Sequence, residues 1–259
     1  MMQEDGLKKA HLSLTLLQKK AAEPGLAAAI AEAAGVRILV QTCVLHPVPE
    51  LRVQATSVLG ACIKEADAAF LASALESRVP AGLLRLLREE DRRAKQEGFD
   101  EAVDPDLPVR RTAVVALTDL LLATDEATRA AVLDDPTALS VILIACGNTD
   151  LEVRRGALSL ALAITRIDEA HLALVAAAAD ADAAQTAKAL LTAACAPASD
   201  VTDAGTTIAL QLMLALRGAE ALRDELVAAQ AAEQLTEQKA ALGDAAPAEL
   251  EEALALYTA

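Results

Sequence analysis

Apolar residues recur at helical spacing along most of this chain, with polar residues between them. In one segment, Leu51, Ala55, Val58, Leu59 and Cys62 fall on a single stripe of a helix. Proline or glycine residues separate many of these segments, as expected where helices begin and end. The pattern predicts helices at residues 7–21, 24–34, 36–45, 50–66, 68–77, 80–88, 109–123, 125–133, 136–146, 151–167, 169–179, 181–194, 206–216, 220–242 and 247–257.

A five-residue phrase opens three of these helices. It occurs as Leu51-Arg-Val-Gln-Ala55, Val109-Arg-Arg-Thr-Ala113 and Val153-Arg-Arg-Gly-Ala157, each time after a turn segment. The second and third copies are 44 residues apart, and the first and second are 58 residues apart, which is one such period plus 14 residues. A period in the forties is typical of armadillo and HEAT repeats. We therefore expect an all-α, armadillo-like, right-handed α-solenoid of four to five three-helix repeats with a C-terminal capping helix.

We expect residues 1–259 to form one domain, because a repeat array is a single quasi-linear body. The 14 additional residues map to a charge-dense insertion at 89–105, which contains Phe99. This insertion is interpreted either as a solvated surface loop or as a segment that contacts a partner through Phe99. Residues 244–259 are the expected capping helix, with Glu249, Glu251 and Glu252 near its start, where negative charge complements the helix dipole.

The charge and composition narrow the possible partners. The net charge is −15 and the chain has no Trp, so it would repel phosphate backbones and has few rings on which bases could stack. We expect no nucleic-acid binding. No apolar stretch reaches the roughly 18 residues that a bilayer requires, so we expect no membrane span. The first residues lack the features of a secretory signal. We interpret the cysteines as small buried apolar residues and expect a cytoplasmic protein; they are Cys43, Cys62, Cys146 and Cys195.

No residue pattern for catalysis, cofactor binding or metal binding is found. The chain lacks a nucleophile elbow, a dinucleotide-binding glycine motif and a phosphate-binding loop. Cys43 and His46 have a spacing typical of metal ligands, but a tetrahedral zinc site needs four donors and no second pair follows. His11 and His171 are predicted to be ordinary helix residues. The acidic pairs Asp104/Asp106 and Asp180/Asp182 lack the other ligands of a calcium loop, so we assign them to turns and helix caps. We therefore expect that this protein is not an enzyme.

The candidate site is a surface. In armadillo stacking, the long third helices line the concave face, and the phrase places these helices in register. The register gives rows such as Val53/Arg111/Arg155, with Lys64 and Arg166 further along. Basic residues that recur at one repeat position would fit a partner with acidic groups. The alternative is that the arginines at 110, 111, 154 and 155 only bond to helix carbonyls and acids between repeats.

The order of elements resembles one armadillo family, the cytosolic nucleotide exchange factors that bind heat-shock protein 70. The likeness lies in Gly35-Val-Arg-Ile-Leu-Val40, in the segment from Pro49 to Cys62, in the segment from Asp106 to Leu121, and in the acidic C-terminal helices from Glu220 to Leu254. The resemblance implies a co-chaperone that clasps one lobe of the chaperone's ATPase domain, opens the nucleotide cleft and releases ADP. It acts by binding the open state better than the closed one.

Two functions therefore remain open at this point. One is nucleotide exchange on heat-shock protein 70, with the concave row Lys64, Arg111, Asp119, Arg155 and Arg166 as the partner-binding residues. The alternative is a non-catalytic armadillo adaptor or scaffold for protein–protein interaction. In both cases we expect a monomer that binds a protein partner.

Overall fold

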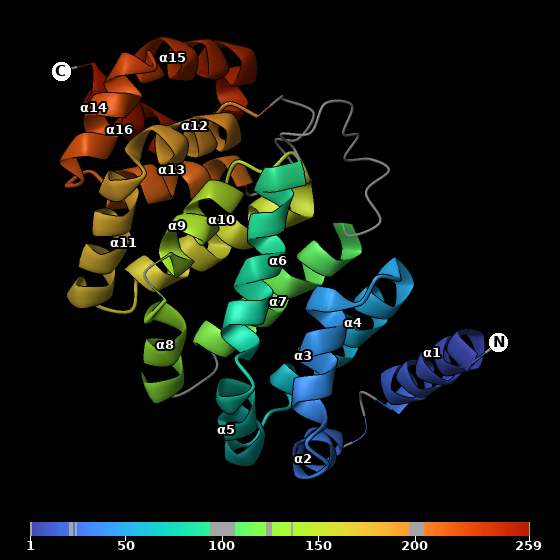
Figure 1. Ribbon diagram of the computed structural model, residues 1–259. Helices are drawn as coiled ribbons and strands as arrows, with labels where there is room; N and C mark the ends of the chain where they lie inside the picture. The colour runs from blue at the N-terminus through green and yellow to red at the C-terminus, as the bar shows by residue number, and fades with distance from the viewer. Residues whose placement is uncertain are drawn as a thin grey trace. The chain divides into compact units, whose positions relative to one another are not determined.

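The computed structural model describes residues 2–20, 23, 25–93, 107–122, 126–135, 137–196 and 205–258. This part of the chain is all α-helical, apart from one 3-10 turn and the connecting residues, and contains sixteen α-helices (Figure 1). Its internal contacts divide the chain into two compact units, Met1–Asp135 and Pro136–Ala259. The expected single domain remains a prediction.

Unit 1 holds the first eight helices, and these agree with the expected order of elements. Proline opens α4 at a position where its missing N–H group costs no hydrogen bond. The helices are α1 (Met2–Lys20), α2 (Leu26–Glu32), α3 (Gly35–Leu45), α4 (Pro49–Lys64), α5 (Ala68–Glu76), α6 (Val79–Arg93), α7 (Leu107–Leu122) and α8 (Glu126–Leu133).

Unit 2 holds the remaining eight. The expected helical stretch at 220–242 is two helices, because Gln230 adopts a left-handed backbone conformation (φ 59°) that ends the first of them. The helices are α9 (Ala138–Ala145), α10 (Leu151–Thr165), α11 (Glu169–Ala181), α12 (Ala183–Ala194), α13 (Gly205–Ala215), α14 (Glu220–Ala228), α15 (Ala231–Leu242) and α16 (Ala248–Tyr257), with a 3-10 turn at Gly243–Ala245.

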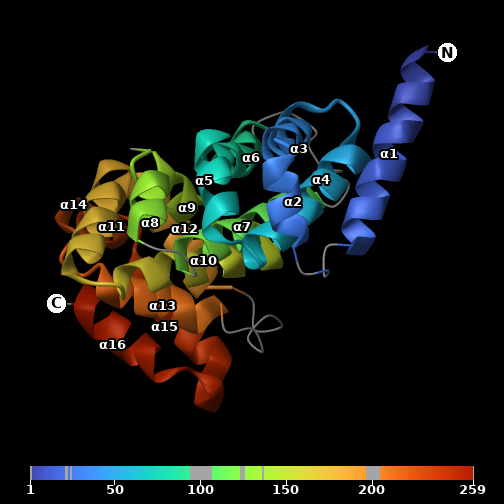
Figure 2. The ribbon, with the colours of Figure 1, turned by 90° about the horizontal axis from the view of Figure 1, so that it is seen from below.

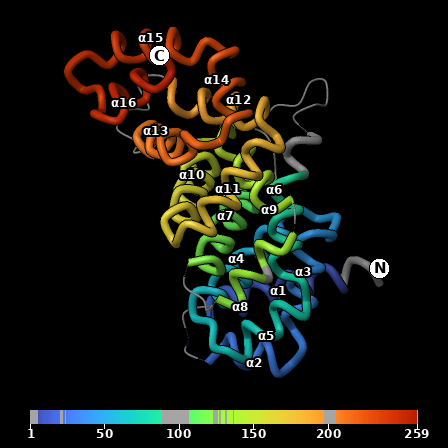
Figure 3. The backbone as a smooth tube through the Cα atoms, turned by 90° about the vertical axis from the view of Figure 1, so that its left-hand side faces the viewer, coloured from blue at the N-terminus to red at the C-terminus, as the bar shows by residue number. Residues whose placement is uncertain are grey.

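In chain order the helices form triplets that end at α4, α7, α10, α13 and α16, and α1 precedes them as a single helix. Within unit 1, α1 packs on α4 and α4 packs on α7, so α1 lies at the edge of that unit (Figure 2). Within unit 2, α10 packs on α13 and α13 on α16, while α14, α15 and α16 lie close together (Figure 3). We call α1, α4, α7, α10, α13 and α16 the third helices.

The repeated phrase occupies the same place in the three triplets that end at α4, α7 and α10. Its closing alanines, Ala55, Ala113 and Ala157, are fully buried or nearly so, at 0 %, 0 % and 1 % exposure. Positions seven residues after them are also buried; they are Cys62, Leu120 and Ile164. The register predicted from the sequence is therefore confirmed. Small alanines at these points let neighbouring helices approach closely.

Two hydrogen bonds between neighbouring repeats in unit 2 have the same sequence spacing. Asp180 on α11 accepts from the Leu222 N–H at the start of α14 (3.0 Å), and Gln238 on α15 donates to the carbonyl of Ala196 (2.8 Å). Both bonds join residues 42 apart. The capping role expected for Asp180 is confirmed. The end of α9 approaches α12 so closely that a Cβ on Gly147 would lie 2.6 Å from the Ala189 Cα, so only glycine fits there.

Two further expectations concern the insertion and the end of the chain. Residues 89–93 of the expected insertion continue α6, while the rest of it, including Phe99, lies outside the described residues, as do Asp104 and Asp106. The expected terminal helix is present as α16. It buries Leu250 and Tyr257 and exposes Glu251 and Glu252.

Within the described ranges, no single helix combines the length and apolar character needed to cross a bilayer. The neighbouring helices α2 and α3 meet that test only as a pair, and the chain bends by 94° between them.

Candidate functional site

The first arginine of the phrase bonds to the turn that precedes α4 and to the turn that precedes α10. Arg52 Nη1 donates to the His46 carbonyl (2.5 Å), and Arg154 Nη1 donates to the Asn148 carbonyl (3.4 Å). The same two turn residues also accept a backbone N–H two positions on: His46 Nδ1 from Val48 (3.1 Å) and Asn148 Oδ1 from Asp150 (2.7 Å). Arg154 therefore bonds to a backbone carbonyl, as one interpretation of these arginines held, but this carbonyl lies in the turn before its own helix and not in a neighbouring helix. Arg52, which that interpretation did not include, makes the same kind of bond.

Arg110 occupies the same position in the second copy and is 2 % exposed. The turn residue that would correspond to His46 is Asp104, which lies outside the described residues. The arginine that follows in the second and third copies faces outward instead: Arg111 is half-exposed and Arg155 is exposed. The third copy thus divides into the turn-holding Arg154 and the exposed Arg155, and the second into the buried Arg110 and the half-exposed Arg111.

Three of the five predicted site residues lie on the third helices of unit 1. Lys64 is exposed at the end of α4, and Arg111 and Asp119 are half-exposed on α7. Burial raises the pKa of the Asp119 carboxyl, and the charge of Lys64 opposes this rise. The structure therefore brings Lys64 and Asp119 near one another across α4 and α7.

The other two predicted residues lie in unit 2, where the third helices are joined by a chain of polar bonds. Arg155 is exposed on α10, and Arg166 Nη2, just after α10, donates to Gln211 Oε1 on α13 (2.9 Å). Gln211 Nε2 in turn donates to Glu249 Oε1 on α16 (2.8 Å), and this bond holds the pKa of Glu249 below its usual range. The chain of bonds thus connects the end of α10 with α13 and α16.

The sequence did not reveal Gln211, because α13 begins without the arginine phrase. The pattern of buried residues aligns α13 with α10 instead, because the buried Ala209 and Leu210 of α13 match Ala157 and Leu158 of α10. Gln211 then falls in the same row as Ser159, two residues after the matched alanine. The predicted five-residue row is thus present as two parts, each within its own unit, and its role in binding remains a prediction.

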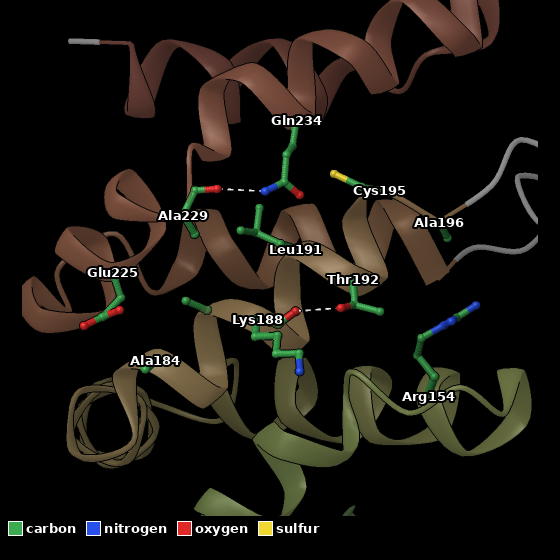
Figure 4. Close-up of a pocket in the computed structure, with 11 residues that line it drawn as sticks. Arg154, Ala184, Lys188, Leu191, Thr192, Cys195, Ala196, Glu225, Ala229 and Gln234 are labelled. Atoms are coloured by element: carbon green, nitrogen blue, oxygen red, sulfur yellow. Dashed lines mark hydrogen bonds between the residues drawn. The ribbon is translucent and has the colours of Figure 1, made fainter. Parts of the chain in front are cut away.

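A hollow of about 480 Å³ lies along α12 in unit 2, and sequence reasoning did not find it. Figure 4 shows Arg154, Lys188 and Thr192 on one side of α12 and Gln234 and Cys195 on the other. The Gln234 amide donates to the Ala229 carbonyl (2.7 Å), and the Thr192 hydroxyl donates to the Lys188 carbonyl (2.8 Å). Burial, reinforced by Glu237, raises the pKa of Cys195 to about 11, so its sulfur is a thiol at neutral pH.

The histidines and cysteines serve local structure. His171 is buried, as expected, and its Nδ1 lies 2.8 Å from Asp168 Oδ1, while His11 is exposed. The cysteines form no disulfide, and three are buried. Burial raises the pKa of Cys43 to about 12 and that of Cys62 to about 11, and it raises the pKa of Cys146 as well. Within the described segments, no group of three or more His, Cys, Asp or Glu side chains could hold a metal ion.

No protein-family model and no curated protein sequence matches the chain. Solved structures do match, and among them are designed armadillo repeat proteins. A computationally designed armadillo repeat protein for modular peptide recognition has a TM-score of 0.61 and 15% identity, and the match covers 97% of this chain and 92% of that one. The designed armadillo repeat protein YIII(Dq)4CqI has a TM-score of 0.60 and 14% identity, over 95% and 92% of the two chains.

A third similar structure is a designed armadillo repeat protein in complex with the peptide (KR)4 (TM-score 0.59, 15% identity, covering 98% of this chain and 92% of that one). At these identities the likeness concerns the fold alone. The chain therefore has an armadillo-repeat α-solenoid fold, as its repeated phrase predicted.

Proposed function

We propose that this chain is a non-catalytic armadillo-repeat scaffold that binds another protein through its third helices. The observation that carries the proposal is the shared register of these helices, in which buried positions repeat while the surface positions differ from copy to copy. A repeated backbone with variable outward residues is how solenoids build extended binding surfaces. The designed relatives in fold lend support, since one is described as made for peptide recognition and another holds a peptide.

The side chains that could do chemistry support a non-catalytic function. His46 Nδ1 accepts a backbone N–H, and His171 Nδ1 contacts a capping aspartate. The raised pKa values of the cysteines make them poor nucleophiles at neutral pH. We propose a cytoplasmic location on the sequence grounds given above.

Site-specific photo-crosslinking in the source cell tests this proposal. A photoreactive phenylalanine analogue would replace Ala61 on α4 or Ser159 on α10, and Ala173 on α11 would serve as the exposed control position. We expect crosslinks to a partner protein from the third-helix positions and few from the control. Equal crosslinking at all three positions, or none at any, would contradict the proposal.

Nucleotide exchange on heat-shock protein 70 is the more specific candidate within this class. The sequence likeness over the phrase Leu51-Arg-Val-Gln-Ala55 and the acidic C-terminal helices favours it. The test is to load the chaperone's ATPase domain with fluorescent ADP and to add this protein. Faster release supports exchange, and charge reversal at Arg111 and Arg155 should then slow it. Unchanged release at micromolar protein would reject exchange and leave the scaffold function standing.

A further inference from the structure

Large apolar side chains are exposed on two of the three neighbouring third helices of unit 1. On α1, Leu12 is 60 % exposed and Leu16 is 51 % exposed. On α7, Val115 is 58 % exposed and Leu122 is 43 % exposed. Burial of such side chains against a partner is favourable in proportion to the apolar area removed from water. The set is therefore a candidate contact surface.

These side chains are related to one another by the repeat register. Thr15 of α1 accepts a hydrogen bond from Gln54 of α4 (3.3 Å). The same kind of close approach joins α4 to α7, where a Cβ on Gly60 would lie 3.3 Å from the Thr112 side chain. Thr15 thus corresponds to Gly60, and Gln54 to Thr112. The same offsets place Leu12, Ser57 and Val115 in one row, and Leu16, Ala61 and Asp119 in the next.

The two rows cross three packed helices, with small side chains on the middle one. Ser57 and Ala61 on α4 are half-exposed, while the leucines of α1 and Val115 of α7 project on either side. We call these six positions, with Leu122, the unit 1 face. Helix axes lie about 8–10 Å apart, so the unit 1 face spans about 20 Å, or about six residues of an extended chain.

Basic side chains dominate the ends of the unit 1 face. Lys19 and Lys64 lie at the C-terminal ends of α1 and α4 in one row, and Arg111 lies near the start of α7. Asp119 is itself near Lys64, whose charge opposes the rise of its pKa. The described surface charges on α1, α4 and α7 and just after their ends are mostly basic: the basic residues are Lys8, Lys9, Lys19, Lys20, Arg52, Lys64 and Arg111, and the acidic ones are Glu23, Glu50, Glu65 and Asp119. Of these, Lys20 pairs with Glu23 (3.0 Å). This local balance is opposite to the net charge of −15.

We propose that the unit 1 face binds a short acidic segment of a partner protein that carries apolar anchor residues. The inference rests on the proposed scaffold function and names the chemistry of its partner. The apolar anchors would contact Leu12, Leu16 and Val115, and the acidic residues would face the lysines at the helix ends. A protein segment fits better than a lipid surface, because the half-exposed Asp119 carboxyl lies among the apolar residues and would lose water in hydrocarbon without gaining a hydrogen bond there.

Three labelled eight-residue peptides test the chemistry with the full chain by fluorescence anisotropy at physiological salt. They alternate glutamate with leucine, lysine with leucine, and glutamate with serine. We expect the glutamate–leucine peptide to bind at least about tenfold more tightly than the other two. Long-range attraction to a chain of net charge −15 favours the lysine peptide, so tighter binding of that peptide would overturn the proposal.

Variants then locate the binding. The double variant Leu12→Ser/Leu16→Ser should weaken the glutamate–leucine peptide about tenfold or more, because two anchors are lost. Ile38→Ser is the matched control, since Ile38 is 64 % exposed on α3 in the same unit but outside the unit 1 face. Lys64→Glu should also weaken binding, and Arg37→Glu on α3 should not. Equal loss in the control variants would place the binding elsewhere.

A vesicle experiment and the crosslinking experiment complete the test. Anionic phosphatidylserine vesicles should not bind in a manner that depends on Leu12 and Leu16, and such binding would replace the protein partner with a membrane surface. Circular dichroism of each variant confirms that it is folded. If crosslinks still form at Ala61 while no acidic peptide binds, the scaffold function holds and only the proposed partner chemistry is wrong.

Discussion

The third helices of the two units bury residues at the same repeat positions but expose different side chains. In unit 2, Arg166 bonds to Gln211 and Gln211 bonds to Glu249 across α10, α13 and α16, so these side chains use part of their hydrogen-bonding capacity within the protein. In unit 1, the corresponding rows carry exposed leucine and valine, of which Leu12 is 60 % exposed. The buried residues of the phrase set the position of each surface residue on its helix. The chemical type of that surface residue then determines which partner groups the helix can bind. Binding specificity can therefore differ between units without a change of fold.

The largest expected effect on stability concerns the buried alanines that occupy the same repeat position in the two units. Ala113→Leu in unit 1 and Ala157→Leu in unit 2 each add three carbons at a position that is at most 1 % exposed. Overpacking at such sites costs about 1–3 kcal/mol of unfolding free energy. Urea unfolding followed by circular dichroism measures it, and Ala173→Leu at an exposed position of α11 should change little. A neutral Ala157→Leu beside a destabilised Ala113→Leu would mean that the units do not share this register.

The turns before the third helices should show a smaller effect. Arg52→Met and Arg154→Met remove a charged donor from the carbonyls of His46 and Asn148, at a cost of about 1–2 kcal/mol each. Arg155→Met is the control, because its side chain is exposed, and it should stay within about 0.5 kcal/mol. Thermal unfolding of the three variants measures the difference. A larger cost for Arg155 than for Arg154 would reverse the assigned roles.

The smallest effect concerns a helix cap that differs between the units. Asp67 accepts the N–H of the buried Phe70 (2.7 Å) at the start of α5, and Asp168 accepts that of His171 (2.9 Å) at the start of α11. Asp168 has a second bond, to His171 Nδ1, and the backbone bond followed by this side-chain bond lowers its pKa. His171→Phe copies the unit 1 arrangement, so the pKa of Asp168 should rise part of the way to its usual value.

The sign of the resulting pH dependence follows from linkage. A carboxyl whose folded pKa is lowered stabilises the protein above its unfolded pKa, and this contribution is lost as the pH falls through the folded value. The His171→Phe variant should therefore lose less stability than the parent as the pH falls below about 4, the usual pKa of an aspartate. Carbon-13 NMR titration of Asp168 checks the pKa directly. An unchanged Asp168 titration would show that the ring bond contributes nothing.

The fold and part of the surface could be predicted from the sequence. A phrase that recurs in helical register reports burial, so Ala55, Ala113 and Ala157 could be aligned without coordinates. The role of the arginines could not be predicted, because the same sequence fits both a groove that binds a partner and bonds within the protein. The bond from Arg154 to the Asn148 carbonyl is visible only in the structure.

Gln211 and the exposed leucines escaped sequence analysis for another reason. Gln211 follows a helix start without the phrase, and α1 was not aligned with the copies of the phrase, so Leu12 could not be assigned to a surface row. The row that connects Leu12 to Ser57 and Val115 depends on the contact between Thr15 and Gln54 across two helices. That contact joins residues 39 apart and leaves no periodic signature in the sequence.

The stacking of the third helices within each unit has a consequence for biosynthesis. Within each unit the packed helices come from neighbouring triplets, so a nascent triplet finds its docking surface on the segment made just before it. Ribosomes add about 5–20 residues per second, so a 44-residue period emerges in about 2–9 seconds, far longer than helices need to form. Each unit can thus assemble progressively during translation, and apolar surface awaiting a successor is exposed for only a few seconds.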